Sequence, residues 1–135
     1  METDIGIRNL SGQDVDLQSL REAASRTLAA ENADLATLSL ALVDDERMIN
    51  LNQRLLGRDY ATDVIAFEAD EGEGEIIICV DTARRQGEAE GHDTLTELRY
   101  LVAHGVLHVL GYDDSDDASR ASMLRRQDDI LSDRQ

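Results

Sequence analysis

The sequence contains no lysine and no proline, and its aromatic residues are three tyrosines and one phenylalanine. So few aromatic rings leave little surface for stacking nucleobases. The single cysteine, Cys79, cannot form an internal disulfide, and within the apolar run IIICV we expect a buried thiol without a catalytic role. No apolar run is long enough to span a membrane, and the start METDIGIRNL carries acids where a signal peptide is basic and apolar. We therefore expect a cytoplasmic protein.

Acidic residues dominate the charge, because all thirteen basic residues are arginines and the formal net charge is -16 at pH 7. Hydrated carboxylates keep such a chain soluble. The same charge repels nucleic acid over most of the surface. RNA binding would therefore need a local basic patch or a metal ion, and we expect no DNA partner.

The 135 residues, of which 41% are hydrophobic, suffice for one core, so we expect a single domain over residues 1–135. Alternation of apolar residues or β-branched runs predicts strands at 4–8, 37–43, 63–69 and 74–80. Helical spacing and capping residues predict helices at 15–32, 44–57, 81–91, 94–111 and 115–131. Asp44 should cap the second of these helices and Gly57 end it, and Asp81 should cap the third. Thr94 should cap the fourth, with Glu97 in capping-box spacing. The fold class is α+β, a small mixed four-stranded sheet packed with about five helices, with the strands at 63–69 and 74–80 at its centre.

The segment HGVLHVLGYDD, residues 104–114, holds two of the three histidines. Four residues advance a helix by about 400°, so His104 and His108 project from one face, one turn apart. Gly111 suits the left-handed residue that ends a helix, after which Asp114 can approach the same point. Two imidazoles and a carboxylate are zinc ligands, and three protein ligands leave a fourth position open, as in catalytic sites. The sequence thus predicts one zinc ion per chain, on a helix and the turn after it.

A plainer interpretation is an amphipathic helix with two ordinary polar histidines, because this spacing also arises by chance. The third ligand is the weaker assignment, because Asp114 lies in an acidic cluster with Asp113, Asp116 and Asp117.

Three segments together resemble the YbeY family, bacterial metal-dependent endoribonucleases of ribosomal RNA maturation. HGVLHVLGYDD is similar to the family signature H-G-x-L-H-L-x-G-Y-D-H. LNQRLLGRDYATDVIAF, residues 51–67, resembles L-N-x-x-Y-R-G-x-D-x-P-T-D-V-L-S-F, and GEIIIC, residues 74–79, resembles G-D-I-V-I-C. MLRRQDDIL is similar to the closing helix of the family, so the likeness runs from about residue 36 to the end of the chain.

Two departures from the family pattern bear on the site. Asp114 stands where the family has its third histidine, and a carboxylate there adds negative charge to the metal site. The family's Tyr-Arg pair falls on Leu55 and Leu56, so the arginine that the resemblance implies for the substrate phosphate is absent from its usual place. Arg58 is our catalytic candidate for its replacement, with a solvated surface arginine as the alternative.

The resemblance implies a zinc-dependent, single-strand-specific endoribonuclease in ribosomal RNA maturation and ribosome quality control. RNA, above all ribosomal RNA, is then the expected partner, with ribosomal proteins as further candidates and no membrane. One alternative is a YbeY-like module that binds RNA or ribosomes and has lost turnover. Another is a zinc hydrolase of a different substrate, but Gly105 stands where the H-E-x-x-H peptidases carry their glutamate base, which disfavours peptide hydrolysis.

Three further expectations concern single segments. Alternate residues of TDVIAF, either Val64 and Ala66 or Ile65 and Phe67, should fill the interior. His92 should be an exposed loop residue without a role. Arg84 and Arg85 should pair with acidic neighbours such as Glu88.

Overall fold

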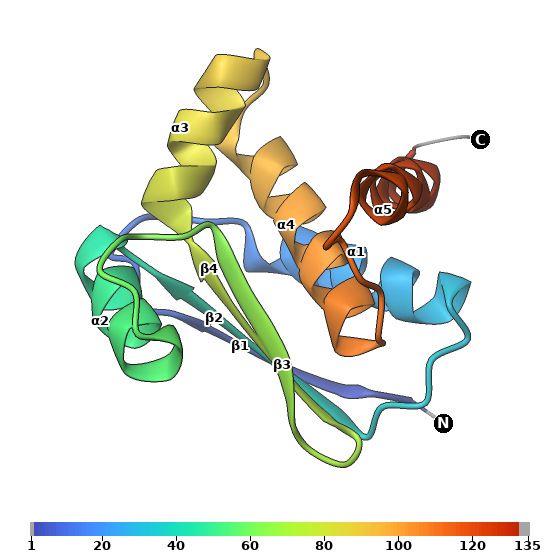
Figure 1. Cartoon of the computed structure of the whole chain (residues 1–135). Helices are drawn as coiled ribbons and strands as arrows, with labels where there is room; N and C mark the ends of the chain where they lie inside the picture. The colour runs from blue at the N-terminus through green and yellow to red at the C-terminus, as the bar shows by residue number, and fades with distance from the viewer. Residues whose placement is uncertain (1, 133–135) are drawn as a thin grey trace.

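Four strands form one mixed sheet in the computed structural model, which describes residues 2–132 (Figure 1). They are β1 (Asp4–Asn9), β2 (Thr37–Val43), β3 (Val64–Asp70) and β4 (Glu73–Cys79). The spatial order is β1-β2-β4-β3, with β1, β2 and β4 parallel and β3 antiparallel to β4. The prediction that β3 and β4 together form the centre is therefore wrong for β3. The tight hairpin turns β3 back along the outer side of β4 and leaves it at an edge.

Within the described part of the chain, five helices accompany the sheet, as predicted. They are α1 (Leu17–Ala30), α2 (Asp45–Leu56), α3 (Val80–Glu90), α4 (Thr94–Val109) and α5 (Asp117–Leu131). The α+β class with a four-stranded mixed sheet is confirmed, and residue 1 and residues 133–135 of the predicted domain lie outside the described residues. Within residues 2–132, no helix combines the length and the apolar character needed to cross a membrane.

The helix ends follow capping rules, although two predicted caps are wrong. Asp44 caps α2 by accepting a hydrogen bond from the Arg47 amide, and Gly57 ends that helix with a φ of 69°, both as predicted. Helix α3 begins directly after β4, so Asp81 lies in its first turn and is not its cap. Helix α4 is capped by Asp93 and not by Thr94, because the Asp93 carboxylate accepts from the Thr96 amide.

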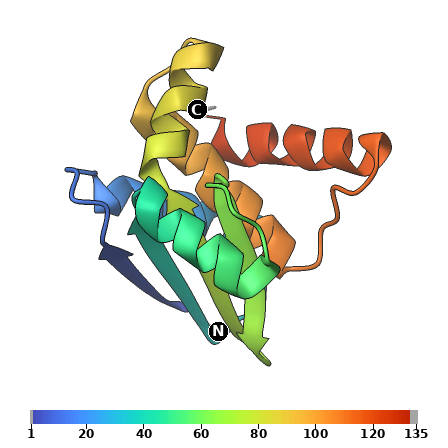
Figure 2. The same ribbon diagram turned by 60° about the vertical axis from the view of Figure 1, so that its left-hand side comes forward.

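The two faces of the sheet carry separate apolar clusters. The main cluster joins Leu38 and Leu40 of β2 to buried residues of α1, α3 and α4. On the opposite face, Met48 of α2 packs with Val43, Ile65 and the buried Cys79. In Figure 2, α2 lies in front of the strands and α4 behind them. The edge strand β3 thus runs between these two helices, and the candidate site lies there.

Candidate metal centre and cleft

Helix α4 holds the two histidines on one side, one turn apart. Its buried residues, among them Leu98, Val102 and Val106, fix the helix against the core, while the side chains of His104 and His108 stay 19% and 26% exposed. The two rings are nearly perpendicular, at 81°, and their centroids are 4.5 Å apart. Their Nε2 atoms are 3.1 Å apart, so both rings direct the same atom toward one point.

The turn after α4 brings Asp114 to that point. Gly111, with a φ of 105°, ends the helix as predicted. The Tyr112 hydroxyl donates to Glu31, the C-cap residue of α1, at 2.9 Å and anchors the turn, and this bond raises the pKa of Tyr112. Asp114 Oδ2 lies 3.6 Å from His104 Nε2 and 3.4 Å from His108 Nε2.

The neighbouring carboxylate of Asp113 faces another way. It accepts hydrogen bonds from the hydroxyl and the amide of Ser115, at 2.6 and 3.0 Å, and these bonds hold the pKa of Asp113 below its usual value. Among the four acids of this segment, Asp114 is the one that the structure groups with His104 and His108.

Hydrogen bonds at the far side of each ring decide which nitrogen is free. His104 Nδ1 lies 2.8 Å from Gln127 Oε1, and His108 Nδ1 lies 3.1 Å from the carbonyl of Tyr112. Both partners accept, so each Nδ1 carries a proton, and Nε2 is the nitrogen through which each ring can bind a metal ion. Two ring nitrogens and a carboxylate then converge. A cation among them removes the repulsion, and this donor arrangement is the usual one around a protein-bound metal ion.

The spacing of the three atoms suits zinc. Four ligands at about 2.05 Å from a tetrahedral ion stand about 3.3 Å from one another. The three separations here, between the two histidine nitrogens and from each to Asp114, are 3.1, 3.4 and 3.6 Å. The residues present therefore fit a tetrahedral metal ion with one position left for a further ligand.

A cleft of about 650 Å³ opens beside this cluster. His104, His108 and Asp114 form one wall, and the other walls come from the start of β3 and the end of α2. Arg58 lines the cleft, so the structure brings the catalytic candidate together with the three candidate ligands. Leu55 and Leu56, at the positions of the family's Tyr-Arg pair, line it too and make that wall apolar.

Sequence reasoning missed three residues around the site. Gln127 on α5 is 4% exposed and orients His104. The sequence could have indicated it, because Gln127 is a polar residue at a position where the helical spacing calls for a buried one. Asp63 and Phe67 line the cleft at the two ends of its β3 wall. Phe67 is 38% exposed, whereas Ile65, two residues earlier on the same face, is 7% exposed. The prediction was that either Val64 and Ala66 or Ile65 and Phe67 would fill the interior. Val64 and Ala66 are partly buried against the main core, whereas of the second pair only Ile65 is buried.

His92 also departs from its prediction. Its side chain is 28% exposed, and its Nε2 lies 2.6 Å from a carboxylate oxygen of Glu97. This contact occupies the residue that was expected to complete a capping box with Thr94. His92 therefore serves the start of α4, away from the three candidate ligands.

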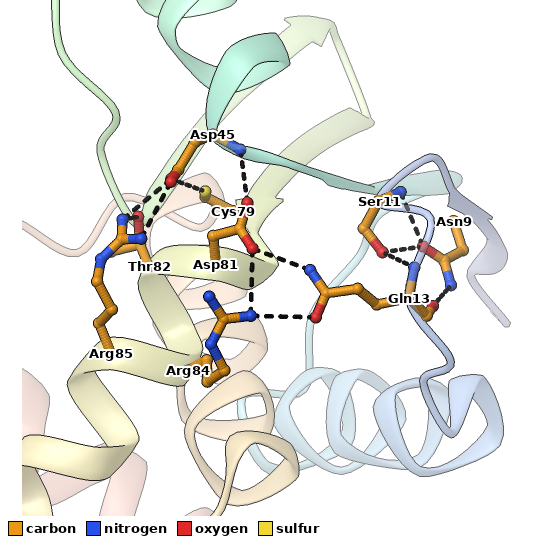
Figure 3. A network of polar contacts seen from close by, with 9 residues as sticks. All are labelled: Asn9, Ser11, Gln13, Asp45, Cys79, Asp81, Thr82, Arg84 and Arg85. Atoms are coloured by element: carbon orange, nitrogen blue, oxygen red, sulfur yellow. Dashed lines mark hydrogen bonds and ion pairs between the residues drawn. The ribbon is translucent and has the colours of Figure 1, made fainter.

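A second group of potential ligands, Asp45, Cys79 and Asp81, joins α2 to α3 (Figure 3). Arg85 donates two hydrogen bonds of 3.0 Å to the Asp45 carboxylate, which lower the pKa of Asp45. Arg84 pairs with Asp81 at 3.3 Å. Burial raises the pKa of the Cys79 thiol, which donates to Asp45. Because guanidinium groups neutralise both carboxylates, we interpret this group as a structural contact that holds α2 against α3.

The same network corrects the expected partners of the two arginines. Arg84 and Arg85 do pair with acidic residues, but with Asp81 and Asp45 in place of Glu88.

Gly105, between the two histidines, is fixed by packing. A Cβ at this position would lie 2.8 Å from Cγ2 of Ile76 on β4, so α4 can approach the sheet this closely only because residue 105 has no side chain. A glutamate base at this position is therefore sterically excluded, which extends the argument against a peptidase from the sequence to the structure.

The fold and this site define a small α+β protein with a candidate three-ligand metal centre facing an open cleft. The model of the family described as Endoribonuclease YbeY matches residues 7–135, and the chain belongs to that family. This confirms the resemblance drawn from the motifs. Endoribonuclease YbeY of Salinispora tropica is 37% identical over 95% of this chain and 94% of the relative. That of Bacillus licheniformis is 40% identical over 74% and 73%.

A solved structure has the same fold. The solution structure of TM1509 from Thermotoga maritima matches with a TM-score of 0.66 and 28% identity, over 92% of this chain and 85% of that chain.

Proposed function

We propose that this protein is a zinc-dependent endoribonuclease that cleaves single-stranded RNA in ribosomal RNA maturation and ribosome quality control, in the cytoplasm. Membership of the YbeY family supports a nuclease that acts on RNA. The observation that carries the metal-dependent mechanism is the convergence of His104 Nε2, His108 Nε2 and Asp114 Oδ2 at the wall of a cleft. Ribosomal RNA is the proposed substrate, and ribosomal proteins are candidate partners.

The residues of the cleft have different roles in the proposed reaction. His104, His108 and Asp114 would hold the ion, and Gln127 and the Tyr112 carbonyl keep both imidazoles in the tautomer that binds metal. A bound zinc ion supplies Lewis acidity toward a phosphoryl oxygen. Arg58 places a permanent positive charge in the same cleft, where it binds the phosphate and counters the charge that develops during cleavage. The apolar wall at Leu55 and Leu56 excludes water from one side of the substrate.

The first experiment measures zinc per chain and RNA cleavage on the same preparations. We expect near-stoichiometric zinc in the wild type, and loss of both zinc and cleavage in His108→Ala and Asp114→Ala. Asp113→Ala is the matched control, because this neighbouring carboxylate faces Ser115, and it should keep both. Zinc content that is the same in Asp113→Ala and Asp114→Ala would contradict the assignment of the third ligand.

The role of Arg58 is tested separately. Arg58→Ala should lower kcat/KM for RNA by about 100- to 1000-fold, the range for losing one group that stabilises charge in the transition state, while zinc content stays unchanged. Arg54→Ala is the matched control, because Arg54 lies in the last turn of α2, four residues before Arg58, but does not line the cleft. Equal loss in the two variants would argue against a specific role for Arg58.

A second candidate function is RNA binding without turnover. It is favoured by Leu56, which stands where the family's arginine is expected and gives the cleft an apolar wall in place of a charge. Zinc-loaded wild type that binds single-stranded RNA but does not cleave it would support this candidate over the nuclease.

A further inference from the structure

The cleft reaches across the free edge of β3. Among the described residues this strand pairs only with β4. The Cys79 amide donates to the Asp63 carbonyl at 2.9 Å, so in the antiparallel alternation the N–H and C=O of Ala66 point away from β4, toward the open edge. The backbone edge therefore forms part of the cleft wall.

Side chains on the two faces of β3 give the cleft two chemically different halves. Val64 and Ala66 pack toward the main core, on the side of α4 and its histidines. Ile65 packs against Met48 of α2 on the other face, and Phe67 projects from that face because residues two apart in a strand share a side. One half is thus polar and holds the candidate metal ligands, and the other is apolar.

The apolar half has an unusual degree of exposure. Phe67 is 38% exposed, and Leu55 and Leu56 at the end of α2 are 49% and 51% exposed. All three line the cleft. Phe67 is also the only phenylalanine of a chain that has few aromatic residues. An exposed aromatic ring in a cleft with a metal-ligand cluster has the composition of a nucleotide site, in which a flat apolar base and an anionic phosphate are bound separately.

We propose that the apolar half of the cleft is a nucleobase subsite, in which an unpaired base of the RNA stacks on Phe67 and packs against Leu55 and Leu56. The phosphate of that strand then lies at the metal centre and Arg58, so the inference rests on the proposed function and extends it to substrate selection. A base in a duplex is stacked and paired and cannot enter, which gives the site its preference for single strands. The outward N–H and C=O of Ala66 can hydrogen-bond to the edge of the base.

The negative charge of the protein makes a local contact to a base important for RNA binding. With a net charge of -16, the protein gains little from a diffuse attraction for RNA, so affinity has to come from local contacts. A neutral base on an aromatic ring contributes without opposing that charge.

The test uses a short single-stranded RNA with one mapped cleavage site, together with versions that carry an abasic residue on either side of it. Cleavage (kcat/KM) and binding (Kd) are measured for wild type, Phe67→Ala, Phe67→Leu and Phe67→Trp. We expect the wild type to lose between about 5- and 150-fold in affinity when the stacked base is removed, the range of base–aromatic stacking. Phe67→Ala should bind the intact RNA and the RNA that lacks the stacked base equally weakly. Phe67→Leu should discriminate between these two RNAs almost as little as Phe67→Ala, and Phe67→Trp should discriminate between them as the wild type does.

Tyr60→Ala is the matched control. Tyr60 is another exposed aromatic residue, 54% exposed, but it does not line the cleft. This variant should discriminate between the two RNAs as the wild type does. Circular dichroism and zinc content verify that each variant is folded, and Phe67→Trp provides a second route if Phe67→Ala unfolds.

The outcomes separate the subsite from the nuclease activity. Cleavage with discrimination that does not depend on Phe67 would overturn the subsite and leave the endoribonuclease intact. Binding that discriminates through Phe67 without any cleavage would support the subsite and overturn the catalytic proposal. If a lysine-rich extended peptide binds in a Phe67-dependent manner while neither RNA does, the strand edge is a protein-docking site and the nucleobase proposal is wrong.

Discussion

Gln127 offers the sharpest test of how the fold prepares the metal centre. Its Oε1 atom accepts from His104 Nδ1 at 2.8 Å, and the residue is 4% exposed. Gln127→Met keeps the length and the apolar stem of the side chain but removes the acceptor. The His104 ring then loses the bond that fixes its tautomer, and its Nε2 competes less well for metal. Partners of this kind are worth about 10- to 100-fold in metal affinity.

That range corresponds to about 1.4 to 2.8 kcal/mol of binding free energy. Competition against a chromophoric zinc chelator at neutral pH measures it directly. Gln127→Glu should bind zinc at least as tightly as the wild type, because a carboxylate is a stronger acceptor for the same proton. Met123→Leu, one turn earlier on the buried side of α5, changes packing but no hydrogen bond and should leave the affinity unchanged. Wild-type zinc affinity in Gln127→Met would refute the reasoning.

Two further predictions concern stability. Gly105→Ala should lower the free energy of unfolding, measured by urea denaturation, by up to about 2 kcal/mol. The clash with Ile76 costs about 1–3 kcal/mol, and the gain in helix propensity returns about 1 kcal/mol. In an Ile76→Ala background the same substitution should become neutral or stabilising. The hydrogen bonds from Arg85 hold the pKa of Asp45 below its ordinary value of 3.8, so this pair stabilises the fold above that pH and the contribution is lost as the pH falls through the lower folded-state value. Because the Asp45 side chain is 39% exposed, the effect is at most about 1 kcal/mol, and Asp45→Asn should give a flatter acid-unfolding curve below about pH 4.

Local sequence patterns predict the elements well and their arrangement less well. Leu38, Leu40 and Leu42 alternate as a strand, and all three are buried. Strand order depends on contacts between residues far apart in the chain, and the apolar run at the start of β3 fits a central strand as well as an edge strand. The start of α4 shows a similar limit, since Asp93 and Thr94 are both good caps and Asp93 forms the bond.

The histidine segment was predictable because helical geometry alone places His104 beside His108. Gly111 ends the helix, and the turn that follows can bring Asp114 back toward the two histidines. The structure brings the three together, and their binding of metal stays a prediction. The contacts that orient the rings could not be predicted in the same way. Gln127 is 23 residues from His104 in the sequence, and it reaches the site only because α5 packs on α4.

The open edge of β3 also bears on how copies of this protein behave toward one another. An unpaired strand edge with apolar side chains is a template for pairing with a second copy. Here carboxylates stand at both ends of the strand, Asp63 before it and Glu68 and Asp70 within its exposed end. Pairing in either direction would bring like charges together, on chains that each carry a net charge of -16. The acidity that makes RNA binding demanding therefore also protects the exposed edge from self-association, and this protection weakens where salt or acid screens or neutralises the carboxylates.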